Sequence, residues 1–210
     1  LPLYDGVHVG DLTIGVVVGL LAAVIVAAVR RLGTAVDGRG DRLGMPALLL
    51  GGALAVGLLA ELADLLGADP LDVLFSGQAS IPAVIGEDST KIIVVLLVAK
   101  FLAYGVSLGC GFRGGPIFPA IFLGIALASL TVVWFDVSPT LAVAVGTAAG
   151  MAAQTRLIVT PVLLSTLLVG SQGLDTVPAA VLATASAWLA MALVDKRNER
   201  STVAVPPGAA

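Results

Sequence analysis

The chain has 210 residues, of which 58% are hydrophobic and only 12% are charged, and its formal net charge is −3 at pH 7. This composition is typical of integral membrane proteins and excludes an ordinary water-soluble domain, so a lipid bilayer is the expected surrounding. The small net charge, with basic residues spread along the chain, gives no indication of a nucleic-acid partner.

The first predicted helix runs from Asp11, which can cap it, to about Leu32. Arg39 and Arg42 follow in a polar loop, and the positive-inside rule assigns this loop to the cytoplasm. A second helix, about 46–66, has a proline in its first turn and should return to the outer side.

Proline and glycine break residues 67–88 into pieces that are too short to span, so short helices are expected at the outer face. Asp88 and Ser89 offer N-caps for a third long helix that ends at about Leu108. Further helices are predicted at about 117–134, 139–153, 157–168 and 177–194, the middle two being short for a crossing. The predicted fold is an all-α integral membrane protein with about seven membrane helices, several broken or short. Residues 1–194 form its transmembrane domain, and 195–210 form a cytoplasmic, mostly disordered tail.

One stretch, GCGFRGGPIFPAIFLG at residues 109–124, interrupts an otherwise apolar region with glycines, prolines and an arginine. Non-helical backbone at membrane depth is tolerated only where protein buries it or where it lines an aqueous cavity. Glycine lets another molecule approach the backbone, and Pro116 and Pro119 suit the first turn of a new helix. The amide end of that helix favours an anion site. The alternative is that the stretch only marks a kink or a close helix crossing.

Residues 111–119, GFRGGPIFP, resemble the Gly-x-Phe-x-Pro motif and the preceding glycine-rich run of the CLC chloride channels and chloride/proton antiporters. Residues 146–160, GTAAGMAAQTRLIVT, resemble the family's small-residue helix, its break and its next helix, and the resemblance extends over roughly 10–194. It implies a CLC-like half of an inverted-repeat architecture and a homodimer through the last helices, about 157–194. The anion-binding residues that it implies are Gly114, Gly115, Pro116, Ile117, Phe118 and Pro119, with the backbone amides of Ile117 and Phe118 as donors.

The chain also departs from the family pattern. Phe118 directly precedes Pro119, whereas the family has one residue between these positions, and Pro116 removes an amide. The family's first half, which carries a serine loop and a gating glutamate, has no counterpart in the chain, so the chain is expected to be a C-terminal half. The family's anion-binding tyrosine near the last helix is absent, since the tyrosines are Tyr4 and Tyr104.

Other polar residues are candidates for an anion pathway. Arg113 adds positive potential beside the new helix, and Lys100 and Ser107 lie on the membrane helix before it. Each also has a structural interpretation, because basic side chains hold backbone carbonyls and hydroxyl groups are routine in helix packing. Arg156, between the two short helices, is expected to satisfy the carbonyls that end the first of them.

No catalytic set stands out in the sequence, and the single Cys110 and single His8 give no basis for a metal site or a cofactor. An enzyme is therefore not expected. The predicted function is transport of chloride or a similar inorganic anion across the cell membrane, by a channel or by a proton-coupled antiporter. The alternatives are another broken-helix secondary transporter, for a different anion or a carboxylate, and a non-transporting membrane scaffold.

Overall fold

The computed structural model describes residues 1–4, 6–40 and 44–203, with side chains to residue 198; Arg42 and the tail residues 204–210 lie outside this part. All regular structure in the described residues is helical, and seven helices have eleven residues or more. They are α1 (Val9–Asp37), α3 (Met45–Leu65), α6 (Thr90–Gly109), α7 (Ile117–Phe135), α8 (Pro139–Thr155), α9 (Val159–Val169) and α10 (Val177–Val203). Two five-residue helices, α4 (Pro70–Leu74) and α5 (Ile81–Ile85), precede α6, and the 3-10 helix η1 (Gly170–Thr176) joins α9 to α10. The predicted all-α membrane fold is confirmed.

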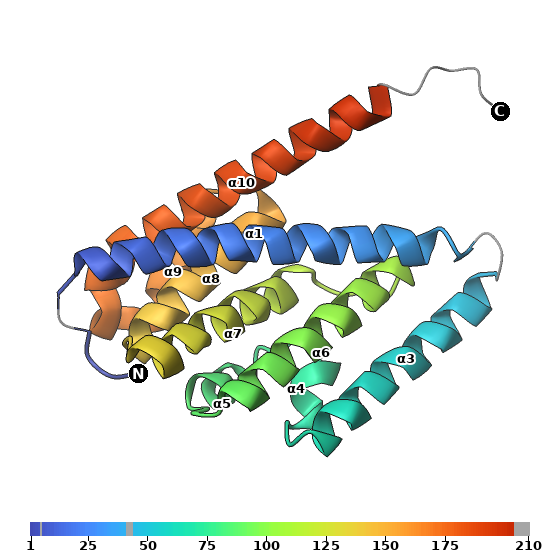
Figure 1. Ribbon diagram of the computed structural model, residues 1–210, viewed down its shortest axis with the longest axis horizontal. Helices are drawn as coiled ribbons and strands as arrows, with labels where there is room; N and C mark the ends of the chain where they lie inside the picture. The colour runs from blue at the N-terminus through green and yellow to red at the C-terminus, as the bar shows by residue number, and fades with distance from the viewer. Residues whose placement is uncertain (5, 41–43, 204–210) are drawn as a thin grey trace.

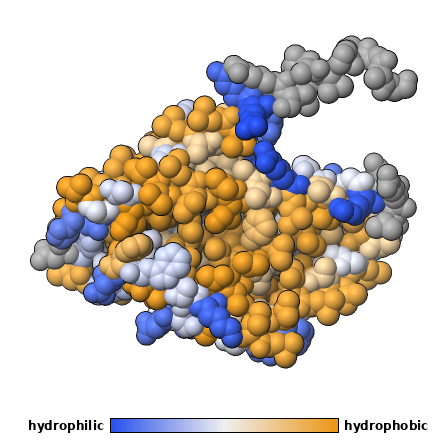
Figure 2. All heavy atoms as spheres, in the orientation of Figure 1, coloured by the Kyte–Doolittle hydropathy of each residue, from blue (hydrophilic) through white to orange (hydrophobic). Residues whose placement is uncertain are grey.

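Five segments within the described residues are long and apolar enough to cross a membrane: Val9–Asp37, Met45–Leu65, Thr90–Gly109, Ile117–Phe135 and Val159–Asn198. On α3, Leu50, Leu54, Leu58 and Leu62 are exposed at four-residue intervals, which is a stripe suited to lipid contact. Figure 2 shows an apolar surface across the middle of the molecule, with hydrophilic residues gathered toward its ends. These features are those of a multi-pass membrane protein.

The helices α1 and α10 pack closely together and run in the same direction (Figure 1). A Cβ atom added to Gly15 would lie 2.6 Å from the Ala179 carbonyl oxygen, and one added to Gly19 would lie 2.5 Å from that of Ala183. Glycine therefore allows the two backbones to approach, as small residues do in membrane helix pairs.

The helix α10 continues to Val203, beyond the predicted end at Val194. Residues 195–203 contain neither glycine nor proline, and the side chain of Asp195 is held by Arg156. The charged residues that suggested a tail are therefore compatible with a helix, and the predicted helix boundary was wrong.

The helix α8 lies in the interior of the bundle. Every residue from Thr140 to Ala153 is buried, and α8 contacts α1, α7, α9 and α10. A Cβ atom added to Gly150 would lie 2.2 Å from the carbonyl oxygen of Ala120 on α7. Because its neighbours surround it, α8 does not need the length of a lipid-facing helix.

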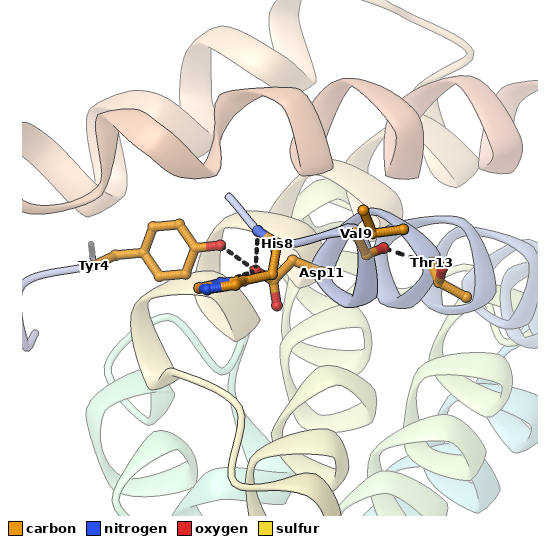
Figure 3. A network of polar contacts seen from close by, with 5 residues as sticks. All are labelled: Tyr4, His8, Val9, Asp11 and Thr13. Carbon is orange, nitrogen blue, oxygen red and sulfur yellow. Dashed lines mark hydrogen bonds and ion pairs between the residues drawn. The ribbon is translucent and has the colours of Figure 1, made fainter. Parts of the chain in front are cut away.

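The start of α1 is organised by residues that precede it (Figure 3). The carboxylate of Asp11 accepts hydrogen bonds from the backbone N–H of His8, at 2.9 Å, and from the hydroxyl of Tyr4, at 2.5 Å. Burial, and next the hydrogen bond to Asp11, raise the pKa of the Tyr4 phenol. Asp11 was predicted to be the N-cap residue, but α1 begins at Val9, so Asp11 caps from the third helical position.

Candidate functional site

The predicted break in the membrane helices lies between α6 and α7. Gly111 has a φ angle of +73°, a left-handed conformation that glycine adopts without strain, and α7 begins at Ile117 after the N-cap Pro116. On the first turns of α7, Ala120 and Leu123 share a core cluster with Ala23, from the middle of α1. The start of α7 therefore lies beside the midpoint of a membrane-spanning helix (Figure 1).

A cavity of about 310 Å³ opens between α3, α4, α6 and the loop before α7. Seven of the nine predicted site and pathway residues line it: Lys100, Ser107, Arg113, Gly114, Gly115, Pro116 and Pro119. The remaining two, Ile117 and Phe118, do not line it. The predicted site uses only the backbone amides of these two residues, which lie at the start of α7.

The two glycines of the loop leave space around the backbone. A Cβ atom added to Gly114 or Gly115 meets no atom within 4 Å, and neither residue has a positive φ angle. In the first turn of α7, the amide hydrogens of Ile117 and Phe118 have no carbonyl partner within the helix. Pro119 contributes no amide hydrogen, so α7 begins with fewer donors than an ordinary helix.

Lys100 is 2% exposed and binds the end of the short helix α4. Its Nζ atom donates to the carbonyl oxygens of Asp72 at 2.8 Å and Val73 at 3.2 Å, and also to that of Phe75. The ring of Phe122 lies 5.0 Å from the ammonium group, in cation–π geometry. An ammonium group has three hydrogens, and these three bonds use all of them. Lys100 therefore contributes a positive charge to the cavity wall, but it has no N–H group left to donate a hydrogen bond to a ligand.

Tyr104 is a cavity residue that sequence reasoning missed. Its hydroxyl donates to the Pro116 carbonyl oxygen at 2.7 Å, which connects α6 to the residue that precedes α7. A signal was present, because Lys100, Tyr104 and Ser107 follow one another at spacings of four and three residues, the pattern of one helix face.

The polar character of the cavity is basic. Lys100 and Arg113 line it together with the hydroxyls of Ser76, Tyr104 and Ser107, and its wall includes no acidic residue from the described part of the chain. Asp72, whose charge acts on Lys100, is 9% exposed and lies outside the lining. In the same part of the chain, no group of three or more His, Cys, Asp or Glu residues is placed to hold a metal ion. Basic side chains that line a cavity make its electrostatic potential more positive.

Arg156 does not have the role that was predicted for it. Its side chain pairs with Asp195, whereas the carbonyl oxygen of Gln154 accepts from the guanidinium of Arg30 at 2.6 Å. The backbone of Arg156 is left-handed, with a φ angle of +64°, and its carbonyl accepts from the indole N–H of Trp188 at 3.1 Å. This backbone turn directs the Arg156 side chain toward α10, so Arg30, on another helix, satisfies the end of α8.

The broken helix, the fully surrounded α8 and the basic cavity together define a membrane protein of the broken-helix class, in which ion sites are built at interrupted helices. The family profile described as "Voltage gated chloride channel" matches residues 11–191, and the chain therefore belongs to this family. The resemblance to CLC proteins is thereby confirmed.

Curated relatives of the chain carry the name "Putative ion-transport protein YfeO" and come from Escherichia coli strain SMS-3-5 / SECEC, Escherichia fergusonii and Escherichia coli O7:K1 strain IAI39. Each is 37% identical over 87 residues, which are 39% of this chain and 19% of the relative. The match therefore covers about a fifth of the length of these relatives. No solved structure matches the chain.

Proposed function

We propose that the chain forms part of a transmembrane path for chloride or a similar inorganic anion in the cell membrane, with the anion held at the start of α7 near Ile117. The observation that carries this proposal is the cavity, because its lining includes Lys100 and Arg113 and no acidic residue among those described. Membership of the chloride channel family and the ion-transport name of the relatives support the movement of an ion.

Residues that line the cavity and the adjoining start of α7 have separate roles in this proposal. Gly114 and Gly115 leave room for the anion to reach the backbone, and the amides of Ile117 and Phe118 donate to it. Lys100 and Arg113 attract the anion by charge, and the hydroxyl of Ser107 lies along its route. Partial charges from amides replace water without binding as strongly as a full charge, so the anion can leave again.

The proposal extends to the assembly. A homologous first half, in the same protein or in a partner chain, would close the open side of the cavity, in keeping with the small share of the relatives that the chain matches. Two copies would associate through α9 and α10, whose outward faces are apolar. A channel and a proton-coupled antiporter both fit such a site, and they differ in whether a proton gradient drives chloride uptake.

Chloride binding by the purified, detergent-solubilised chain tests the site, measured by calorimetry with and without its natural upstream sequence. Gly115→Val fills the space in front of the amides, and we expect at least a tenfold loss of chloride affinity. Gly51→Val is the matched control, because Gly51 also has no atom near its Cβ position but lies on α3, outside the cavity. Equal losses in the two variants, or no loss in either, contradict the placement of the anion.

The same titration separates the alternative functions. A carboxylate that competes with chloride would favour another secondary transporter. Absence of anion binding in both the short and the extended protein would favour a membrane scaffold. Binding by the extended protein alone would show that the site needs both halves.

A further inference from the structure

A second cavity lies where the C-terminal parts of α1 and α10 diverge (Figure 1). It has a volume of about 150 Å³ and is called here the α1–α10 wedge. Its lining comes from both helices: Ala27, Arg30, Arg31 and Thr34 of α1, and Met191, Val194, Asp195 and Asn198 of α10. None of these residues lines the cavity beside α7, so the two sites are separate.

The wedge has an excess of positive charge. Arg30 and Arg31 line it, and Asp195 is the one carboxylate among the described lining residues. Asp195 pairs with the guanidinium of Arg156, which does not line the wedge. The Nε and Nη1 atoms of Arg156 are buried and have no acceptor in the described part of the chain. Burial lowers the pKa of Arg156; Asp195 opposes this effect, and the nearby Arg30 adds to it. Among the described lining residues, two guanidiniums, those of Arg30 and Arg31, face one carboxylate, and that carboxylate already pairs with Arg156. An added anion would offset this excess of positive charge.

The shape of the wedge favours an amphipathic anion. Arg31 is exposed at its rim, whereas Ala27, Met191 and Val194 form an apolar wall that continues along the two helices. The wedge lies near the end of membrane-spanning α1, on the side that the positive-inside rule assigns to the cytoplasm. Anionic lipids are concentrated in the cytoplasmic leaflet, and basic pockets between membrane helices on that side bind their headgroups.

We propose that the α1–α10 wedge binds the phosphodiester headgroup of an anionic phospholipid, with Arg30 and Arg31 at the phosphate and an acyl chain along the apolar wall. Guanidinium groups suit this role because their planar N–H groups match two phosphate oxygens at once. Arg30 also donates to the end of α8, so a lipid bound there would stabilise the contact between α1, α8 and α10.

Lipid binding can be measured on the complete chain by native mass spectrometry, with phosphatidylglycerol and phosphatidylcholine of the same acyl chains as probes. We expect one phosphatidylglycerol to bind more tightly than phosphatidylcholine. Arg31→Gln should weaken it about fivefold, which corresponds to ~1 kcal/mol for one basic residue near an anionic lipid surface. Arg39→Gln is the matched control, since Arg39 is exposed in the turn after α1, donates to the Ala35 carbonyl oxygen and lies outside the wedge.

Three results would overturn the proposal. The first is equal binding of phosphatidylglycerol and phosphatidylcholine by the unaltered chain, a comparison that requires no variant to fold. The second is the same phosphatidylglycerol affinity for Arg31→Gln as for Arg39→Gln. The third is displacement of the lipid by millimolar inorganic phosphate, which would identify the site as one for a free anion.

Discussion

The buried ammonium group of Lys100 holds the wall of the cavity beside α7. Its replacement by methionine keeps the length of the side chain but leaves the carbonyl oxygens of Asp72, Val73 and Phe75 without their donor. Because an unsatisfied buried polar group costs about 1–3 kcal/mol, we expect Lys100→Met to lower the free energy of unfolding by at least that amount. The midpoint of thermal unfolding in detergent measures the effect, and about 2–4 °C corresponds to 1 kcal/mol at this chain length.

Lys91→Met provides the comparison for this substitution. Lys91 lies on the same helix and loses the same charge, but its side chain is exposed in the first turn of α6. The midpoint should therefore change little. If the two variants unfold at the same temperature, the three hydrogen bonds of Lys100 add nothing to the stability of the protein.

For single residues, the sequence indicates which polar side chains lie in apolar surroundings, but it does not predict their hydrogen-bond partners. A lysine within an apolar helix indicates a buried charge, but the carbonyl groups that bind Lys100 lie 25 to 28 residues earlier in the chain. The bond from Arg30 to the end of α8 joins residues 124 positions apart. Such contacts depend on tertiary packing, which no local pattern records, and Arg156 was assigned the role of Arg30 for this reason.

Among the elements, the crossing of α7 and α8 determines where the start of α7 lies. A Cβ atom added to Gly146 would lie 2.6 Å from both the Gly124 carbonyl oxygen and the Ile125 Cα atom. These are backbone atoms that cannot rotate away, so Gly146→Ala must separate the helices. We expect a loss of about 1–3 kcal/mol, the usual cost of overpacking, measured by thermal unfolding.

Gly57→Ala on α3 is the matched control, because a Cβ atom there meets no atom within 4 Å. Alanine favours a helix over glycine by about 1 kcal/mol, so this variant should be as stable as the unaltered chain or slightly more stable. A Gly146→Ala protein that unfolds no earlier than Gly57→Ala would show that the two helices are not in close contact.

The boundaries of most elements could be predicted because glycine and proline mark them. The break before α7 and the short helices between α3 and α6 follow from such residues. Other boundaries were predicted wrongly. The helix α1 continues past Gly33 to Asp37, beyond its predicted end at about Leu32. Asp11 indicated a helix start but acts from the third position, and the charged residues after Val194 indicated a tail although they continue α10.

For the whole molecule, hydrophobicity identifies the chain as a membrane protein. It does not tell whether an exposed apolar surface contacts lipid or another protein chain. On α9, Val159, Leu163 and Leu167 are exposed at four-residue intervals, just as the leucines of α3 are. The proposed homodimer gives the two stripes different roles, because the α9 stripe would be covered by the second copy and the α3 stripe by lipid. A paired substitution on each stripe can separate these roles.

If α9 forms the interface of the proposed homodimer, Leu163→Trp combined with Leu167→Trp should give a monomer in detergent, because the bulky rings would hold the two α9 surfaces apart. Leu54→Trp combined with Leu58→Trp on α3 should remain dimeric, since those leucines are 66% and 61% exposed and would contact lipid. Light scattering with correction for bound detergent gives the protein mass, relative to 21.0 kDa for one chain. A single-chain mass for the unaltered protein would refute the dimer, and a dimeric α9 variant would place the interface on another face.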